Sequence, residues 1–271
     1  MSKIFLYIII ITFACLLLIS CNVLDSNSDI TPIEGKIYFK LWENYDYNME
    51  EQYPKIELVL ETEKIYPHTG HSINANLTVH GNTINIGIEG VYNCGAGGAT
   101  PSPASWREFL DISDGKHALN FIIYSTKNKK HNSYQIVLDK NTITIEDDEQ
   151  SFTIPKYKKY CRYPQNSFAY LFGSLTDDSY ICKDFIDSLK NIIPIEQFTF
   201  PDNCIIPYSS ASSGHYYDAP AQFYKYKDEK YFDIAGEFLK TYSADIISKH
   251  QGMSISLIGW NNKTVKSWLY D

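Results

Sequence analysis

The sequence predicts a mainly β protein with α+β character, in which an N-terminal antiparallel β-sandwich, immunoglobulin-like, precedes a small α+β domain. Three observations predict this arrangement. Apolar and polar residues alternate through most of residues 34–155, as they do in half-buried strands. Helical spacing of apolar residues occurs only beyond residue 156. The 22 tyrosines add support, since tyrosine favours strands and half-exposed sheet faces.

The first twenty residues have the anatomy of a signal peptide. Lys3 supplies a positive charge, and residues 4–19 are apolar apart from Thr12. A membrane-spanning helix would need about 20 apolar residues followed by retention signals. Here the run stops at Ser20 and gives way to a polar segment. We therefore expect cleavage rather than a retained helix.

The stretch Leu18-Ile19-Ser20-Cys21 resembles the lipobox of bacterial lipoproteins. The resemblance implies lipidation of the Cys21 sulfur and cleavage after Ser20 by signal peptidase II. Two or three acyl chains then anchor the protein stably in the membrane, because one chain holds only marginally. Asn22 is not the aspartate associated with inner-membrane retention in Gram-negative lipoproteins, which favours the outer membrane; the periplasmic or surface face stays open. The alternative is a secretory peptide with a chance cysteine.

Charge and size limit the classes of function. Lys3 is the one charged residue of the predicted signal peptide, so cleavage lowers the formal net charge from -8 to -9. An acidic chain of this kind has no electrostatic reason to bind nucleic acid. The hydrophobic content of 44% is enough for a core. We expect a signal peptide at 1–20, a tether at 21–33, the sandwich at 34–155 and the α+β domain at 156–271.

The clearest strands form a hairpin, in which residues 73–79 and 84–88 flank a turn at His80, Gly81 and Asn82. Short strands at this spacing, with turn residues between them, suggest a Greek-key sandwich. The other alternating segments carry apolar residues at Ile37, Phe39 and Leu41; Ile56, Leu58 and Leu60; Leu119, Phe121 and Ile123; Tyr134, Ile136 and Leu138; and Ile143 and Ile145.

A glycine-rich segment interrupts these strands. Residues 94–99 and two prolines lead into Ser105 and Glu108, which have the spacing of a capping box. We therefore expect a short helix across one end of the sandwich. The glycines match neither the dinucleotide-binding nor the Walker pattern, so no cofactor is expected.

Two segments of the C-terminal domain have one-sided helical periodicity, and each must cover a sheet. The first spans residues 181–193, between N-capping residues and Pro194. The second has Ile234, Phe238, Tyr242 and Ile246 at a strict spacing of four, with Gly252 as its stop. The sheet would include Ile255 and Leu257, a turn at residues 261–263 and a closing strand over residues 265–270.

Four cysteines beyond Cys21 remain in the mature chain: Cys94, Cys161, Cys182 and Cys204. An even number in an exported chain favours disulfides, and four cysteines permit three pairings. We expect at least one bridge among the last three, which crowd into one half of the chain. A zinc site is disfavoured because no pair has the Cys-x-x-Cys spacing.

No motif identifies a catalytic residue or a metal site. The Gly-x-Ser-x-Gly elbow of serine hydrolases is absent, and the serine-rich loop of residues 209–215 is better explained as flexible. His68 and His71 flank a predicted turn rather than a helix, which disfavours a shared metal. Asp177 and Asp178 are explained by the start of a helix.

An aromatic cluster in the second domain suggests a ligand surface for a sugar or a peptide, although core packing explains the same rings equally well. It consists of Tyr216, Tyr217, Tyr224 and Tyr226. We therefore expect an anchored envelope lipoprotein that serves as a non-catalytic binding or structural module, with a protein or glycan ligand. The alternatives are an exported hydrolase acting on glycan or peptide near residues 205–226, and a subunit of an envelope assembly.

Overall fold

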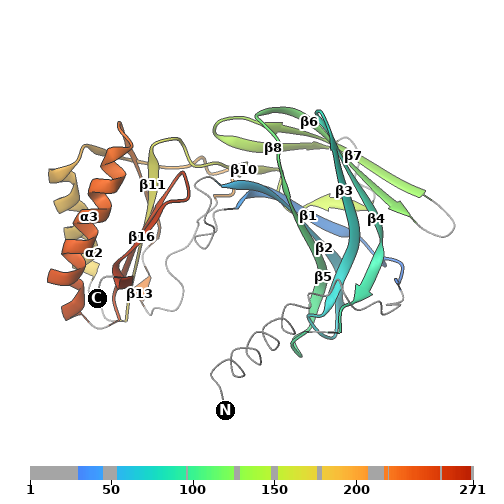
Figure 1. The fold of residues 1–271 in the computed structure, drawn as a ribbon, viewed down its shortest axis with the longest axis horizontal. Coiled ribbons are helices and arrows are strands. Elements are labelled where there is room, and N and C mark those ends of the chain that lie inside the picture. Colours follow the sequence, from blue (N-terminus) through green and yellow to red (C-terminus); the bar gives the residue numbers. More distant parts are fainter. Residues whose placement is uncertain are drawn as a thin grey trace, which may run out of the picture.

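The structure is a computed structural model that describes residues 30–44, 54–95, 97–124, 129–147, 152–175, 179–206, 217–218, 220–250 and 252–269. Within these ranges the chain is mainly β, with two sheets and two α-helices (Figure 1). Cys21, the predicted signal peptide and the serine-rich loop lie outside the described residues, as do Asp177 and Asp178. No helix in the described part of the chain is long and apolar enough to cross a membrane.

Ten strands form the first sheet, in the order β10-β8-β7-β6-β4-β3-β5-β2-β1-β9. Each is antiparallel to the next except β4 with β6, β1 with β9, and a single parallel pair between β3 and β5. Their bounds are β1 (Ile37–Asn44), β2 (Lys55–Tyr66), β3 (His71–His80), β4 (Thr83–Asn93), β5 (Ser102–Leu110), β6 (Gly115–Tyr124), β7 (Lys129–Leu138), β8 (Thr142–Asp147), β9 (Thr153–Pro155) and β10 (Lys159–Cys161).

This sheet curls around its own hydrophobic core (Figure 1). Phe39 of β1 and Tyr134 of β7 are far apart in the strand order, yet their ring centroids are 5.0 Å apart. Tyr134 also donates a hydrogen bond from its hydroxyl to the Thr153 carbonyl at 2.6 Å. The alternating apolar residues expected from the sequence supply this core, because every second side chain of a strand faces the same side.

The mainly β prediction is confirmed, but the immunoglobulin-like sandwich is not, since these ten strands form one sheet rather than two. The sheet is also not wholly antiparallel. After the hairpin of β3 and β4, the chain crosses to pair β5 with β2 and then returns to place β6 beside β4. That crossover makes β4 and β6 run in the same direction.

The helix expected from the capping box is wrong, because residues 102–110 form strand β5. Ser105 pairs with Glu61, and Trp106 pairs with Leu60, both on β2. Ala104 and Leu110 are buried in the core. Forming a single helical turn is unfavourable in free energy, because several backbone dihedrals are fixed for one hydrogen bond. The ladder with β2 satisfies the backbone and buries apolar side chains, so tertiary pairing overrides the local signal.

Six strands form the second sheet, in the order β12-β14-β11-β15-β16, with β13 paired to one end of β11. The paired strands of this sheet are antiparallel to one another. The elements are β11 (Ser167–Ser174), α2 (Ser179–Ile192), β12 (Ile195–Phe198), β13 (Tyr217–Asp218), β14 (Gln222–Tyr226), α3 (Lys230–Asp245), η1 (Ile247–Lys249), β15 (Ser254–Gly259), β16 (Thr264–Lys266) and η2 (Ser267–Leu269).

The main elements of this part follow the β-α-β-β-α-β connectivity of the ferredoxin-like motif, through β11, α2, β12, β14, α3 and β15. Each helix connects two strands that run in the same direction with one strand between them. Both helices lie on one face of the sheet, where their apolar sides share a core with β11 and β15 (Figure 1). An α+β arrangement of these residues was expected from the sequence.

Two details of this part differ from the prediction. On α3 the buried side includes Tyr242 of the expected stripe and Ala235 and Leu239, which were expected beside it, whereas Ile234 of the stripe is 38% exposed. The helix is therefore rotated so that the residues beside the stripe of four are the more deeply buried. The turn at residues 261–263 forms as expected, but β16 ends at Lys266 and a short 3-10 helix follows.

The first sheet also extends past the predicted boundary at residue 155. Lys159, Tyr160 and Cys161 form β10, which pairs with β8 at the end of that sheet. Only five residues separate β10 from β11 of the second sheet. This short connection brings the ends of the two sheets together.

Candidate functional site at the junction of the two sheets

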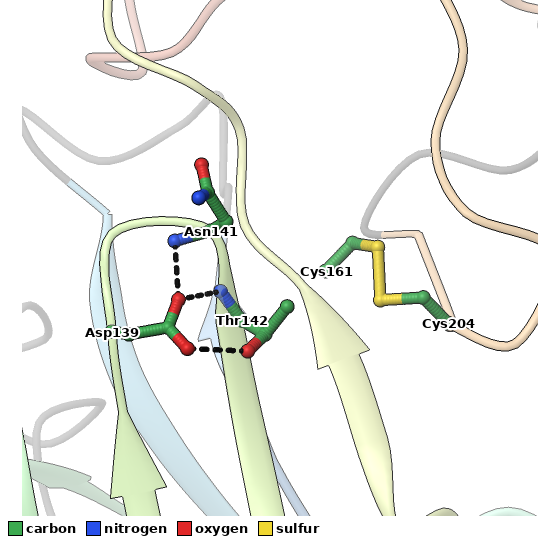
Figure 2. The surroundings of a disulfide bond; sticks show 5 residues. All are labelled: Asp139, Asn141, Thr142, Cys161 and Cys204. Carbon is green, nitrogen blue, oxygen red and sulfur yellow. Dashed lines mark hydrogen bonds between the residues drawn. A yellow bond between two sulfur atoms is a disulfide. The ribbon is translucent and has the colours of Figure 1, made fainter.

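A disulfide joins the two parts of the chain (Figure 2). It links Cys161, the last residue of β10, to Cys204, which lies beyond β12. Beside it, Ile205 forms a parallel bridge with Tyr160. The prediction of a bridge among the last three cysteines is confirmed. Cys94 lies outside this disulfide, and its half-buried thiol donates to the Ser72 hydroxyl at 3.5 Å.

Arg162 follows the disulfide and is the charged centre of the junction. Its Nε donates to Glu43 of β1 at 2.7 Å, and one of its terminal nitrogens donates to Asp114 at 2.6 Å and to the Asp139 carbonyl. Glu43 is only 6% exposed. Burial works against the charge of Arg162, but Glu43 and Asp114 outweigh it and raise its pKa. The guanidinium is thus fixed in place by two carboxylates.

The turn between β7 and β8 forms one wall of the junction (Figure 2). Asp139 accepts hydrogen bonds from the backbone of Asn141 at 2.7 Å and of Thr142 at 2.8 Å, and from the Thr142 hydroxyl at 2.8 Å. Burial alone would raise the pKa of Asp139, but these hydrogen bonds and the charge of Arg162 lower it. The turn is therefore rigid, and the Asn141 carboxamide points away from Asp139 (Figure 2).

These segments enclose a pocket of about 350 Å³, within the range typical of small-molecule sites. Both parts of the chain contribute: β1 and the turns of the first sheet on one side, and the turn after β15 on the other. We call this the junction pocket. It is lined by Glu43, Pro54, Asp114, Lys140, Asn141, Arg162, Tyr163, Pro164, Gln165 and Trp260.

Trp260 supplies the main aromatic surface of the junction pocket. It is half-buried, and its backbone N–H donates to the Ser167 carbonyl at 2.9 Å. The tight turn that follows is closed by hydrogen bonds from Asn262 to Gly259 and from Gly259 to Lys263. Burial raises the pKa of Tyr226, and the neighbouring Trp260 partly offsets this effect. The indole also packs against two hydrophobic clusters of the second part of the chain, which restricts its position.

Three polar side chains at the rim of the pocket are available to a ligand. Lys140, Asn141 and Gln165 are exposed, and their side chains make no hydrogen bond or ion pair with another described residue. The two amides can each donate and accept, whereas the lysine can only donate. The site thus combines a fixed aromatic surface with uncommitted polar groups.

Two further hollows lie outside the junction pocket. One, of about 290 Å³, lies near Cys204 and is lined largely by Phe198, Phe200 and Phe223, whose rings contact one another. The other, of about 400 Å³, lies over the polar side chains around Ala118 on the first sheet. Each draws on one part of the chain only. The junction pocket alone among the three combines aromatic, charged and uncommitted amide groups from both parts.

The predicted tyrosine surface is not formed as expected. Tyr224 is 1% exposed and Tyr226 is 6% exposed, and both lie in the core beneath the helices. These two tyrosines therefore serve packing. Tyr216 lies outside the described residues, and so does the side chain of Tyr217. The side chain of Cys182 on α2 is likewise not described.

His68 and His71 flank a turn, as the sequence predicted. His68 precedes a turn and His71 begins β3, with ring centroids 4.4 Å apart. The Nδ1 atom of His68 accepts from the Gly70 backbone, and the His71 ring contacts the His68 carbonyl. Local hydrogen bonds explain this pair. In the described ranges no group of three or more potential ligands is arranged to hold a metal ion.

No family model, curated protein or solved structure matches this chain. The function must therefore be argued from the site itself. Glu43, Arg162 and Trp260 were not singled out from the sequence as site residues. Lone charged or aromatic residues carry no motif, and only the fold brings these three into one pocket.

Proposed function

We propose that this chain is a bacterial envelope lipoprotein, anchored through Cys21, that acts as a non-catalytic binding module and holds its ligand in the junction pocket. The anchoring rests on the lipobox-like stretch Leu18-Ile19-Ser20-Cys21 that ends the apolar N-terminal run. The Cys161–Cys204 disulfide fits an oxidising compartment outside the cytoplasm. Asn22 favours the outer membrane.

The observation that carries the binding role is the make-up of the junction pocket. A rigid aromatic side chain, Trp260, lies with exposed amides of Asn141 and Gln165 in one small cavity. Fixed surfaces that still carry unused hydrogen-bonding groups are suited to recognition. The two carboxylates of the pocket, Glu43 and Asp114, both accept hydrogen bonds from Arg162. Their role is to position the guanidinium, which favours binding over hydrolysis.

Anchoring is tested by labelled-palmitate incorporation in cells that express the native chain or Cys21→Ala. We expect label and membrane association in the native protein and the loss of both in the variant. Cys15→Ala is the matched control, because it removes a cysteine from the same N-terminal segment and leaves the lipobox-like stretch intact. Palmitate uptake by the Cys21→Ala protein would contradict the anchor.

Binding at the pocket is tested with Gln165→Trp, which places a bulky side chain at the exposed rim. A ligand that binds only the folded state raises the unfolding temperature, and the rise grows with the logarithm of the ligand concentration relative to its Kd. We expect small-molecule probes that stabilise the native protein to stop stabilising the blocked variant. Stabilisation of both proteins to the same degree would place binding elsewhere and contradict the proposed site.

A further inference from the structure

We infer that the junction pocket binds a neutral saccharide, an inference that rests on the binding function proposed above. The first argument is charge. The pocket carries two carboxylates, Glu43 and Asp114, and two cationic side chains, Arg162 and Lys140. The guanidinium is matched to both carboxylates by direct hydrogen bonds. Neither an anionic nor a cationic ligand therefore gains a net attraction from this site.

The second argument is the kind of hydrogen bond on offer. Asn141 and Gln165 each present a carbonyl that accepts and an amino group that donates, and Lys140 adds a donor. A sugar hydroxyl also donates and accepts, so vicinal hydroxyls match paired carboxamides. A wholly apolar ligand would bury these amides without partners, which is costly. The free groups thus select a ligand rich in hydroxyls.

The third argument is the aromatic surface. One side of a pyranose ring presents C–H groups that pack on an aromatic face, while its hydroxyls point outward around the ring. Trp260 lines the cavity together with Tyr163, and Pro54 and Pro164 complete the apolar lining. A volume of about 350 Å³ accommodates a ligand of one or two sugar rings. Stacking on Trp260, with hydroxyls toward Asn141 and Gln165, would use the aromatic lining and both rim amides of the pocket.

The test uses the full chain purified in a detergent without a sugar headgroup, since maltoside or glucoside detergents would compete. Three sets of probes are compared by thermal shift and ligand-observed NMR. The neutral set contains maltose, cellobiose and diacetylchitobiose. The charged set contains digalacturonate and the glucosamine dimer. The third set contains dipeptides and nucleosides, which report binding of ligands other than sugars.

The informative variant is Asn141→Ala with Gln165→Ala, because neither side chain bonds to another described residue and folding is not at stake. The matched control is Asn82→Ala with Gln135→Ala, which removes the same residue types from the hollow on the first sheet. We expect a neutral saccharide to bind the native and control proteins with the same affinity. Its affinity for the pocket variant should be lower by a factor of about ten or more. Trp260→Phe should weaken the same binding, whereas Trp268→Ala should not.

Each other outcome counts against the inference. If probes that are charged or not sugars bind in a pocket-dependent way and neutral saccharides do not, the saccharide inference fails and the binding function stands. If no probe binds in a way that depends on Asn141 and Gln165, both fail. If a neutral saccharide binds all variants equally, the sugar site lies elsewhere and the inference about this pocket is overturned.

Discussion

Arg162 donates from its Nε to Glu43 at 2.7 Å, and this contact ties the segment between the two sheets to the end of β1. Arg162 lies directly after the disulfide-bonded Cys161, so a charged contact and a covalent bond hold the same point. The junction pocket is built around this point. Its shape should therefore depend on both contacts.

Replacing Arg162 with leucine should destabilise the protein by about 2–3 kcal/mol, because it removes the guanidinium from a buried carboxylate. Chemical denaturation followed by circular dichroism measures the loss. The control is Lys64→Leu, whose ammonium lies 3.0 Å from Glu34, with the two side chains 42% and 71% exposed. That exposed pair should contribute less than about 1 kcal/mol. Equal losses in the two variants would show that Arg162 is not a structural centre.

The double variant Cys161→Ser with Cys204→Ser should lose about 4 kcal/mol, since the bridge closes a separation of 43 residues and restricts the unfolded chain. Thermal unfolding measures this loss. Cys94→Ser, at a cysteine outside the disulfide, should change little by comparison. Mass spectrometry after alkylation without reductant should label Cys94 and leave Cys161 and Cys204 unlabelled; labelling of either one contradicts the bridge.

The Asp139 turn predicts a specific dependence on pH. Because the folded state lowers the pKa of Asp139, its contribution is present above the unfolded value near pH 4 and is lost as the pH falls through the lower folded value. Asp139→Asn should therefore cost about 1 kcal/mol at pH 7 and progressively less below about pH 4. Urea titrations across that range test it. A constant penalty for Asp139→Asn across this range would refute the assignment.

Gly252→Ala should destabilise the protein more than Gly81→Ala. Both glycines have a positive φ, 75° and 58°, which penalises any side chain. An added Cβ at Gly252 would lie 2.3 Å from a side-chain carbon of Leu175, whereas at Gly81 nothing lies within 4 Å. The Gly81 variant should cost about 1 kcal/mol from strain, and the Gly252 variant more. Similar melting temperatures for the two variants would mean that the Leu175 contact relaxes freely.

Local patterns predicted the elements whose burial follows a regular period. The alternation at Ile37, Phe39 and Leu41 gave β1, and the spacing of apolar residues over 181–193 gave α2. A regular period works because geometry fixes which side chains share a face. The same reasoning failed for Ser105 and Glu108, where pairing with β2 decided the outcome.

The sequence by itself determined that the alternating segments within residues 34–155 form strands, that the C-terminal part is α+β and that a bridge forms among its cysteines. It also carries the lipobox-like stretch on which the proposed anchor rests. Only the tertiary structure decided that the strands form one curled sheet and that Glu43, Arg162 and Trp260 meet in one pocket. The physical reason is the sequence separation of the interacting residues. A hydrophobic period depends on residues that are close in the sequence, whereas strand order and pocket composition depend on contacts such as Arg162 with Glu43, more than a hundred positions apart.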